Sequence, residues 1–254
     1  MNLCSDCIKG VTHDGNPEGR PKTLGKHGIR TYIAIPNDEY RKGQVVLFLV
    51  DAFNCIEGDR KQLLADDFAR NGWKTVIPDI LNGDGIPLNA LDPDSPPFDW
   101  ATWLLRHGSE QTRPPLDRVL AALKGEGVIK IGATGYCFGG RYVFDLALEN
   151  LIDVAAVSHP SLLKSPEDLE KYAATSKAPL LVNSCTFDVA FPHKAQHNAD
   201  EILGNGKFAP GYSREYFGGC THGFVLKGDL SDPKVKAGKE GAFAAAVAWF
   251  KKNL

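Results

Sequence analysis

A cysteine flanked by glycines is the candidate nucleophile of this sequence. Residues 135–140 read Gly-Tyr-Cys-Phe-Gly-Gly, and they join a β-branched, apolar segment (128–133) to a segment with apolar residues at helical spacing (138–148). A Gly-x-nucleophile-x-Gly turn between a strand and a helix is typical of a nucleophile elbow. At the start of a helix, free N–H groups stabilise a thiolate and can bind an oxyanion. The spacing therefore predicts acyl transfer at Cys137.

Two other interpretations fit the same residues. Free cysteines are commonly small buried core residues, and Cys137 can be one of them. Residues 132–135, Gly-Ala-Thr-Gly, also look like part of a dinucleotide-binding fingerprint after a strand. The third glycine of that fingerprint would be Gly139, one place too late, and the motif usually follows the first strand of its domain. Acyl transfer is the leading interpretation.

Such a nucleophile needs a base, and the base needs a carboxylate that orients it. On α/β folds with this elbow the chain order is nucleophile, acid, histidine. Asp188 and His222 satisfy that order, and each follows a predicted strand. Taken alone, the first can be a helix cap and the second a polar loop residue. His159 and His193 also lie in predicted loops, and His159 directly follows a strand, so we expect it to line the pocket.

The elements expected to position these residues alternate between strand and helix. Segment 81–99 is rich in Pro, Gly, Asp and Asn, which predicts a long irregular loop. The alternation predicts a single doubly wound, mostly parallel sheet flanked by helices, with ligand sites at the carboxyl ends of the strands. We predict strands over 29–36, 44–50, 74–78, 128–133, 154–158, 179–183 and 212–217, and helices over 59–71, 100–107, 114–124, 138–148, 166–174, 193–203 and 234–251.

Composition limits the class of protein. The 254 residues have no break in composition, which predicts one domain over residues 1–254, with residues 1–28 packing on or extending from its core. A hydrophobic content of 43%, a charged content of 24% and a net charge of −2 give no electrostatic footprint for nucleic acid or membrane partners. No stretch is long and apolar enough for a membrane span or a signal peptide, so we expect a cytoplasmic protein.

The six cysteines fit a reducing compartment better than a secreted disulfide framework. Cys4 and Cys7 form a C-x-x-C pair, which zinc or redox chemistry can use, but no second pair lies at zinc-ribbon spacing. We expect a weakly ordered segment there. Neither a metal nor an organic cofactor is expected for the predicted chemistry.

Together, the elbow, the loop Phe187-Asp188 and residues 221–224 (Thr-His-Gly-Phe) resemble the dienelactone hydrolase family of the α/β-hydrolase superfamily. Further matches are 64–69 (Leu-Ala-Asp-Asp-Phe-Ala) and 76–79 (Val-Ile-Pro-Asp), and the resemblance extends from about residue 29 to the C-terminus. The N-terminal Cys-x-x-Cys-x-x-Gly with Thr-His-Asp-Gly is similar to the eukaryotic, often fungal, branch. The resemblance implies the α/β-hydrolase fold and hydrolysis of a small ester or lactone, as by a carboxymethylenebutenolidase.

The resemblance also implies roles for individual residues. Cys137 attacks the carbonyl, His222 carries the proton and Asp188 orients His222, and water then releases the acyl group from a thioester. The backbone N–H groups of Phe138 and Ala52 are expected to form the oxyanion hole. Family members carry an acidic residue that helps gate ionisation of the cysteine. Asp51 occupies that place, where the bacterial enzymes have glutamate, and a turn cap is its alternative role.

The substrate-binding residues depart from the bacterial pattern. The bacterial enzymes hold an anionic substrate with arginines, one of them shortly after the catalytic histidine, where this chain has Leu226 and Lys227. A lysine attracts a carboxylate as a point charge but lacks the bidentate fork of arginine. Other candidate carboxylate partners are Arg106, Arg113 and Arg141. An apolar or aromatic acyl pocket, or else ordinary core packing, is expected from Phe53, Tyr136, Phe138, Phe187 and Phe224.

Three functions stay open. The leading one is a hydrolase that acts on a small-molecule ester or lactone as a monomer or homodimer. The same pocket can instead serve a biosynthetic lactone isomerisation, a ring closure or an acyl transfer, since one fold hosts many reactions. A non-catalytic ligand-binding protein is the third, and the complete triad argues against it.

Overall fold

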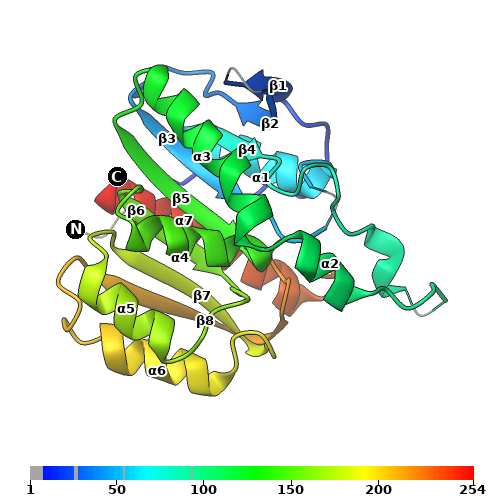
Figure 1. Ribbon diagram of the computed structural model, residues 1–254, viewed down its shortest axis with the longest axis vertical. Coiled ribbons are helices and arrows are strands. Elements are labelled where there is room, and N and C mark those ends of the chain that lie inside the picture. Colours follow the sequence, from blue (N-terminus) through cyan, green and yellow to red (C-terminus); the bar gives the residue numbers. More distant parts are fainter. Residues whose placement is uncertain (1–7, 26–27, 54, 93) are drawn as a thin grey trace.

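One central sheet organises the chain (Figure 1). The computed structural model describes residues 8–25, 28–53, 55–92 and 94–254. In order across the sheet, the strands are β1 (Arg20–Leu24), β2 (Ile29–Ala34), β4 (Lys74–Pro78), β3 (Gln44–Leu49), β5 (Lys130–Tyr136), β6 (Val154–Ser158), β7 (Leu180–Phe187) and β8 (Tyr212–Thr221). The helices are α1 (Asp59–Arg70), the 3₁₀ helix η2 (Leu88–Leu91), α2 (Trp100–Arg106), α3 (Ser109–Gly125), α4 (Phe138–Leu148), α5 (Glu167–Thr175), α6 (His193–Leu203) and α7 (Pro233–Asn253).

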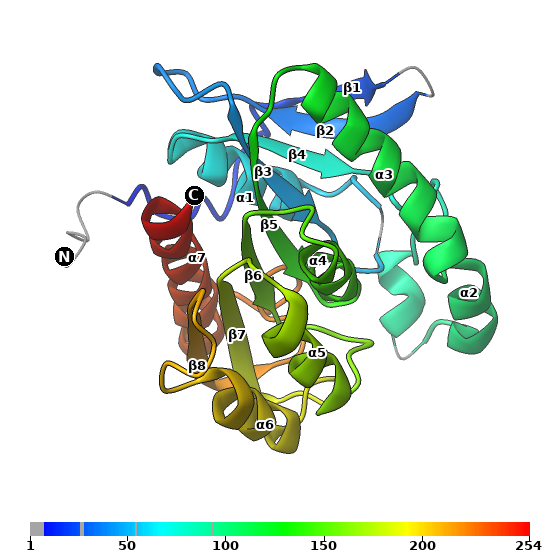
Figure 2. The ribbon, with the colours of Figure 1, turned by 60° about the vertical axis from the view of Figure 1, so that its left-hand side comes forward.

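Strand pairing confirms the predicted fold class. β1, β2 and β4 pair antiparallel at one edge, and all pairs from β4 across to β8 are parallel. Residues of β3 alternate between the two faces, since Val45, Leu47 and Leu49 join one core cluster and Val46 and Phe48 join the other. Helices α3 to α6 cover the first face, and α1 and α7 cover the second (Figure 2). The sheet is therefore doubly wound and buried on both faces, as a central parallel sheet must be.

The strand order reverses beside β3. From β3 the chain passes through α1 to β4 on one side, and it then returns to form β5 on the other side of β3. In open α/β sheets, a crevice for ligands forms at such a reversal, beyond the carboxyl ends of the strands. The loop after β3 and the elbow after β5 both lie there.

The structure corrects several predicted boundaries. Helix α3 begins at Ser109 rather than at Pro114, so both prolines lie inside the helix instead of at its first turn. Proline removes the hydrogen bond to the carbonyl four residues earlier, and the carbonyl of Gln111 accepts a bond from Asn82 Nδ2 at 3.4 Å instead. Strand β1 was not predicted, and β7 and β8 extend four residues beyond their predicted ends.

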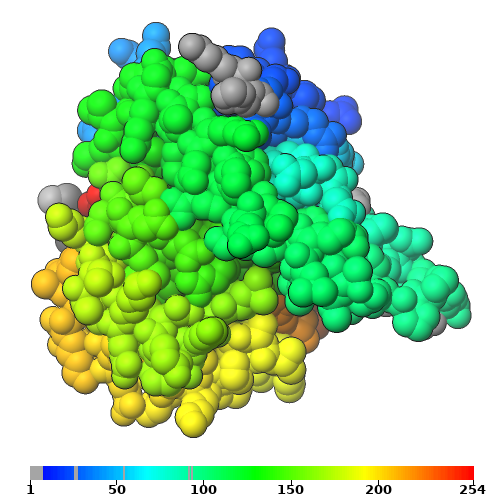
Figure 3. All heavy atoms as spheres, in the orientation of Figure 1, coloured from blue at the N-terminus to red at the C-terminus, as the bar shows by residue number. Residues whose placement is uncertain are grey.

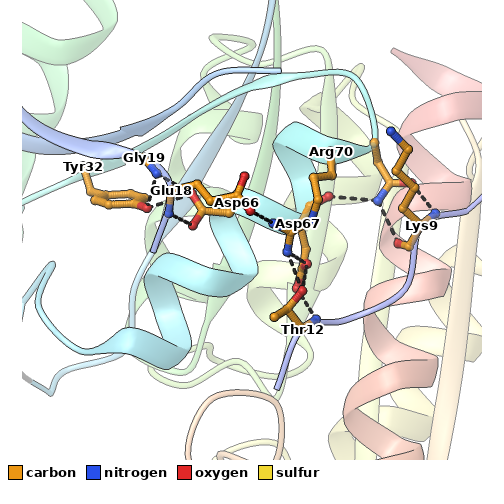
Figure 4. Close-up of polar contacts among 9 residues, drawn as sticks. Lys9, Thr12, Glu18, Gly19, Tyr32, Asp66, Asp67 and Arg70 are labelled. Atoms are coloured by element: carbon orange, nitrogen blue, oxygen red, sulfur yellow. Dashed lines mark hydrogen bonds and ion pairs between the residues drawn. The ribbon is translucent and has the colours of Figure 1, made fainter. Parts of the chain in front are cut away.

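The N-terminal segment, residues 9–19 before β1, packs on α1 (Figure 4). The carboxylate of Asp67 accepts hydrogen bonds from the backbone N–H and the hydroxyl of Thr12, at 2.9 and 3.0 Å, and pairs with Arg70. Asp66 accepts from Glu18 N–H at 2.7 Å, Gly19 N–H at 3.1 Å and Tyr32 Oη–H at 2.7 Å. These contacts join the segment before β1 to the core. Cys4 and Cys7 lie outside the described residues.

The segment from η2 to α2 stands out from the body of the molecule (Figure 3). It begins in the predicted irregular loop 81–99 and ends in the predicted helix 100–107, and it carries the exposed apolar residues Leu88, Trp100 and Leu105. Trp103 anchors it, because its ring is buried and its indole N–H donates to the carbonyl of Asp84 at 2.8 Å. Among the described helices, none is both long enough and apolar enough to cross a membrane.

Candidate active site

The predicted elbow lies between β5 and α4. Cys137 has φ 49° and ψ −113°, a left-handed conformation that a side chain adopts only at a cost of about 1–3 kcal/mol. Neighbouring backbone groups hold it: its N–H donates to the carbonyl of Ser158 at 3.2 Å, and its carbonyl accepts from Gly140 N–H and Ser161 N–H at 3.0 Å each. The sulfur is partly exposed at the first turn of a helix. It is therefore accessible and lies at the positive end of the helix dipole.

Close backbone approach requires the glycines of the elbow. A Cβ at Gly139 would lie 2.2 Å from the carbonyl oxygen of Leu49 and 2.6 Å from that of Val50. A Cβ at Gly135 would lie 2.7 Å from the carbonyl oxygen of Gly139. The start of α4 therefore rests directly on the end of β3. This contact brings the loop after β3 next to Cys137.

Asp188 and His222 meet at the same edge of the sheet. Asp188 directly follows β7 and His222 directly follows β8, and Nδ1 of the histidine lies 2.8 Å from Oδ1 of the aspartate. That oxygen also accepts the backbone N–H groups of Ala190 and Phe191, each at 2.9 Å. The aspartate is buried and held in one orientation. It can fix the ring of His222 with the other nitrogen free to face a reacting group.

The histidine interacts with the cysteine as well as with the aspartate. Burial by itself would lower the pKa of His222, but hydrogen bonds and charge interactions with Asp188 and Cys137 raise the pKa to about 10. A ring with this pKa carries a proton at neutral pH beside the sulfur. A protonated ring is the partner that a cysteine nucleophile needs for its reactive form.

The two predicted oxyanion donors lie at the junction of β3 and α4. Phe138 is the first residue of α4, so its N–H has no carbonyl partner within the helix. Ala52 is buried in the loop after β3, and its carbonyl accepts from Ile86 N–H at 2.8 Å. The next N–H along, that of Phe53, already donates to Asp51 Oδ1 at 3.3 Å. The roles of the Phe138 and Ala52 N–H groups as oxyanion donors stay predictions.

Asp51 forms a buried ion pair that the sequence analysis missed. Its Oδ1 lies 2.8 Å from Nζ of Lys61, which comes from α1, and both side chains are almost completely buried. Its Oδ2 is buried without a hydrogen-bond partner among the described residues. One signal for Lys61 was available, because it occupies the buried helical stripe with Leu64, Ala65 and Phe68.

The predicted pocket residues separate into two groups. Phe53 lies at the site, with Lys227 Nζ 3.1 Å from the centre of its ring, and Phe224 packs on His159 with ring centres 5.4 Å apart. Tyr136 packs in the core against Phe48, as the alternative interpretation expects. Phe187 is 65% exposed at the end of β7.

Lys227 is a cation near the site. Burial lowers its pKa, while the charges of Asp51 and Cys137 act in the opposite direction. It lines an open hollow of about 420 Å³ together with Asp51, Lys61, Leu88 and Leu226. The other candidate cations are engaged elsewhere: Arg106 pairs with Asp84, Arg113 with Asp117 and Glu149, and Arg141 with Asp145 and Asp168.

Two residues after β6 complete the surroundings of the cysteine. His159 is fully buried with its ring 5.1 Å from that of His222, and neither ring nitrogen has a partner among the described residues. Burial, followed by the charge of His222, holds the pKa of His159 well below its usual range. Ser161 was not predicted, and its Oγ lies 3.6 Å from Sγ of Cys137. It also follows a strand, so the rule that located Asp188 could have located it.

Other predicted alternatives lie away from this arrangement. The ring of His193, at the start of α6, lies 6.1 Å from that of Tyr216. Within the described parts of the chain, no group of three or more His, Cys, Asp or Glu side chains is arranged to hold a metal ion.

Comparisons with known proteins identify the family of this chain. The profile of the dienelactone hydrolase family matches residues 29–254. Hydrolase pyvD of Aspergillus violaceofuscus is 32% identical over 98% of this chain and 96% of its own length. The carboxymethylenebutenolidase homolog of Mus musculus is 27% identical over 100% of this chain and 99% of its own length.

The fold has a solved counterpart. The crystal structure of a Klebsiella pneumoniae protein assigned to the dienelactone hydrolases superposes with a TM-score of 0.70 at 19% identity, and it covers 92% of this chain and 98% of that one. The predicted fold class and the resemblance to a eukaryotic, fungal-like branch are therefore confirmed. This chain belongs to the dienelactone hydrolase family, a family of hydrolases with the α/β-hydrolase fold.

Proposed function

We propose that this protein hydrolyses a small ester or lactone through a Cys137–His222–Asp188 triad and a thioester intermediate. The observation that carries the proposal is the bond between His222 and Asp188, which directly follow β8 and β7, with Nδ1 of His222 2.8 Å from Oδ1 of Asp188 at the edge of the sheet where β5 ends in the elbow of Cys137. The placement of the site at the reversal of strand order supports it.

The reaction follows from the order of these groups. The thiolate of Cys137 attacks the carbonyl carbon, and the carbon–oxygen bond of the ester or lactone breaks. The imidazolium of His222 gives its proton to the leaving oxygen. Water then attacks the thioester while His222 takes up a proton, and the thiolate leaves with formation of the acid. Asp188 holds the ring in orientation and stabilises its charged form throughout.

Backbone donors would stabilise the charge that develops on the carbonyl oxygen. The N–H groups of Phe138 and Ala52 are the donors of this proposal, because α4 rests on the end of β3 at Gly139. Donors held before the reaction begins lose no energy in reorganisation. The rigid contact between the two elements supports this role.

Lys227 and the adjacent hollow bear on the substrate. A partly buried lysine over an aromatic ring can attract a carboxylate or another anionic group of a small molecule. Phe53 and Phe224 would add apolar surface for the acyl group. We therefore propose that the substrate is a small ester or lactone with an anionic substituent. We also propose that the enzyme uses neither an organic cofactor nor a metal and that it acts in the cytoplasm.

The experiment is intact-mass spectrometry after a brief exposure to an activated aryl ester. The wild-type chain should gain the mass of one acyl group, located on Cys137 by peptide mapping, or turn over the ester. Cys137→Ala should do neither, and His222→Ala should lose turnover. Hydrolysis would be rejected if the wild-type chain showed neither acylation nor turnover.

A matched control separates loss of the nucleophile from loss of any cysteine. Cys220 is buried on β8, so Cys220→Ala removes a thiol without touching the proposed triad. This variant should acylate as the wild type does. Addition of an alcohol or amine nucleophile to the assay would reveal acyl transfer as a new product in place of the acid.

A further inference from the structure

Lys61 is a buried cation aimed at the loop after β3. It lies on the first turn of α1, and it is 5% exposed. Its Nζ donates to Oδ1 of Asp51 at 2.8 Å, to the carbonyl oxygen of Phe53 and to the carbonyl oxygen of Cys55 at 3.1 Å. An ammonium group has three donors, and all three end on this one loop.

That loop carries Ala52, one of the two proposed oxyanion donors. On one side, the carbonyl oxygens of Leu49 and Val50 lie against Gly139 at the start of α4. On the other side, Lys61 holds the residues directly before and after Ala52. The position of the Ala52 N–H relative to Cys137 is therefore set from both directions.

Stability does not account for this lysine. A buried ion pair gains little free energy of folding, because desolvation of two charges offsets their attraction. An apolar side chain of similar length, such as methionine, would fill the same space among Leu64, Ala65 and Phe68. The charge of Lys61 thus needs another explanation.

The carboxylate of Asp51 explains the charge of Lys61. Asp51 follows Val50, whose carbonyl oxygen lies against Gly139 of the elbow, and it lines one hollow with Lys61 and Lys227, so Asp51, Lys227 and the elbow of Cys137 share one region. A free carboxylate there would oppose both the thiolate and the oxyanion, since like charges disfavour each other in a buried site. The other titratable groups around the cysteine are His159, Asp188 and His222, from the ends of β6, β7 and β8. Lys61 provides the buried positive charge bonded to Asp51.

We propose that Lys61 is a positioning residue of the ester or lactone hydrolase: it neutralises Asp51 and fixes the 51–55 loop, so that Cys137 reacts beside a held carboxylate instead of being gated by a mobile one. The inference rests on the proposed function. It assigns to Asp51 a static role, in place of the gate that the family resemblance implies.

A double-mutant cycle tests the pairing. In Lys61→Met the carboxylate loses its bonded cation and keeps only its interaction with Lys227, so kcat should fall about ten- to hundredfold and the acid limb of the kcat/KM profile should move up by about one pH unit. In Asp51→Asn/Lys61→Met no such charge remains, and the acid limb should return to its wild-type position with part of kcat restored. Lys61→Arg should lie nearer to the wild type than Lys61→Met.

Two outcomes would overturn the proposal. One is a Lys61→Met variant with wild-type kcat and profile, and the other is a double variant with the same shifted limb as Lys61→Met. If Lys61→Met does not fold, Asp51→Asn tests the proposal instead. Lys61 then lacks its negative partner, so the acid limb of the kcat/KM profile should move to lower pH. An acid limb at the wild-type pH would contradict the inference. The Asp51→Asn change is nearly isosteric, so this arm tests charge rather than packing.

Controls distinguish this proposal from the hydrolase proposal itself. Lys239 is buried on α7 at 1% exposure, so Lys239→Met removes a buried lysine elsewhere and should leave the profile unchanged. If Cys137→Ala abolishes hydrolysis while the Lys61 variants behave as the wild type, only the role of Lys61 is refuted. If the wild type itself is inactive and not acylated, the proposed function fails first.

Discussion

The two ends of α1 hold buried charges in different ways. Near its C-terminal end, Asp66 and Asp67 hold the N-terminal segment, and all four carboxylate oxygens accept hydrogen bonds (Figure 4). Near its N-terminal end, Lys61 pairs with Asp51, whose Oδ2 has no partner among the described residues. Every carboxylate oxygen of the first cluster has a hydrogen-bond donor, whereas one carboxylate oxygen of the second has none.

The difference fits a first cluster that supports the fold and a second that lies at the proposed reaction site. Buried polar groups are almost always paired, because an unpaired one costs about 1–3 kcal/mol. The unpaired buried side-chain atoms among the described residues are Asp51 Oδ2, both ring nitrogens of His159, His13 Nδ1 and Asn183 Oδ1, and the ring of His159 lies 5.1 Å from that of His222. Incomplete pairing at a perturbed, titratable site is what a binding or catalytic centre is expected to show. Variants of the first cluster should therefore lower stability, and variants around the proposed reaction site should lower activity.

The largest expected effect is on activity, in Asp188→Asn. The amide can still accept from Ala190 and Phe191 N–H, so near pH 10, where the contribution of protonated His222 is lost, the free energy of unfolding should change by about 1 kcal/mol or less. Without the charge of Asp188, kcat should fall about 10³- to 10⁴-fold. Steady-state kinetics and urea unfolding on the same preparation check this. A fall in stability with an unchanged kcat would mean that Asp188 supports the fold, as Asp66 and Asp67 do, and not the reaction.

The same variant predicts a pH dependence. The pKa of His222 is raised from 6.5 to about 10, so the stability gained by its protonation is complete below pH 6.5 and is lost as the pH rises to 10. The difference in unfolding free energy between the wild type and Asp188→Asn should shrink over that window. The alkaline limb of kcat/KM should lie at lower pH in the variant. Unfolding curves at three pH values between 6.5 and 10 measure the trend.

In the structural cluster, Asp67→Ala should show the opposite pattern. It leaves the N–H of Thr12 and the guanidinium of Arg70 without their buried partner, which should cost about 3 kcal/mol of stability. Because Arg70 keeps 24% side-chain exposure, water should limit the loss. At 25 °C kcat should stay unchanged. Asp38→Ala is the matched control, since Asp38 pairs with Lys9 at the surface with 85% side-chain exposure and should cost under about 0.5 kcal/mol.

Tyr32→Phe tests the neighbouring carboxylate with a smaller change. It removes the hydrogen bond that Tyr32 Oη donates to Asp66 Oδ1 and the one that it accepts from Gly19 N–H at 2.8 Å, and Asp66 keeps its bonds from Glu18 and Gly19 N–H. We expect a loss of about 1.5 kcal/mol in urea unfolding, since the bond is to a charged acceptor. Limited proteolysis of the N-terminal segment should become faster. An unchanged unfolding midpoint would mean that this cluster does not contribute to stability.

His159→Phe should have the smallest effect. Neither ring nitrogen has a partner among the described residues, so the variant loses no hydrogen bond and adds apolar volume beside Phe224. Stability should change by under about 1 kcal/mol, and kcat by less than about fivefold. Kinetics with the aryl ester checks this. A drop of a hundredfold would show that the open nitrogens of His159 take part in the reaction.

Much of the candidate site could be predicted because its parts are local motifs. The elbow at Cys137 needs glycines on both sides, and this requirement is readable at fixed spacing. Asp188 and His222 follow strands whose apolar runs are visible, and parallel strands bring their carboxyl ends to one edge. Element boundaries were less certain, as Pro114 and Pro115 inside α3 illustrate.

The sequence by itself determined the fold class, the chain order of the candidate triad and the elbow, because each follows from a short pattern of residue types. Only the tertiary structure decided the pairing of Lys61 with Asp51, the holding of the N-terminal segment by Asp66 and Asp67, and the place of Ser161 beside the sulfur. These contacts join residues that are far apart along the chain or on different elements. They depend on how helices pack on the sheet, and no local periodicity encodes which buried charge meets which partner.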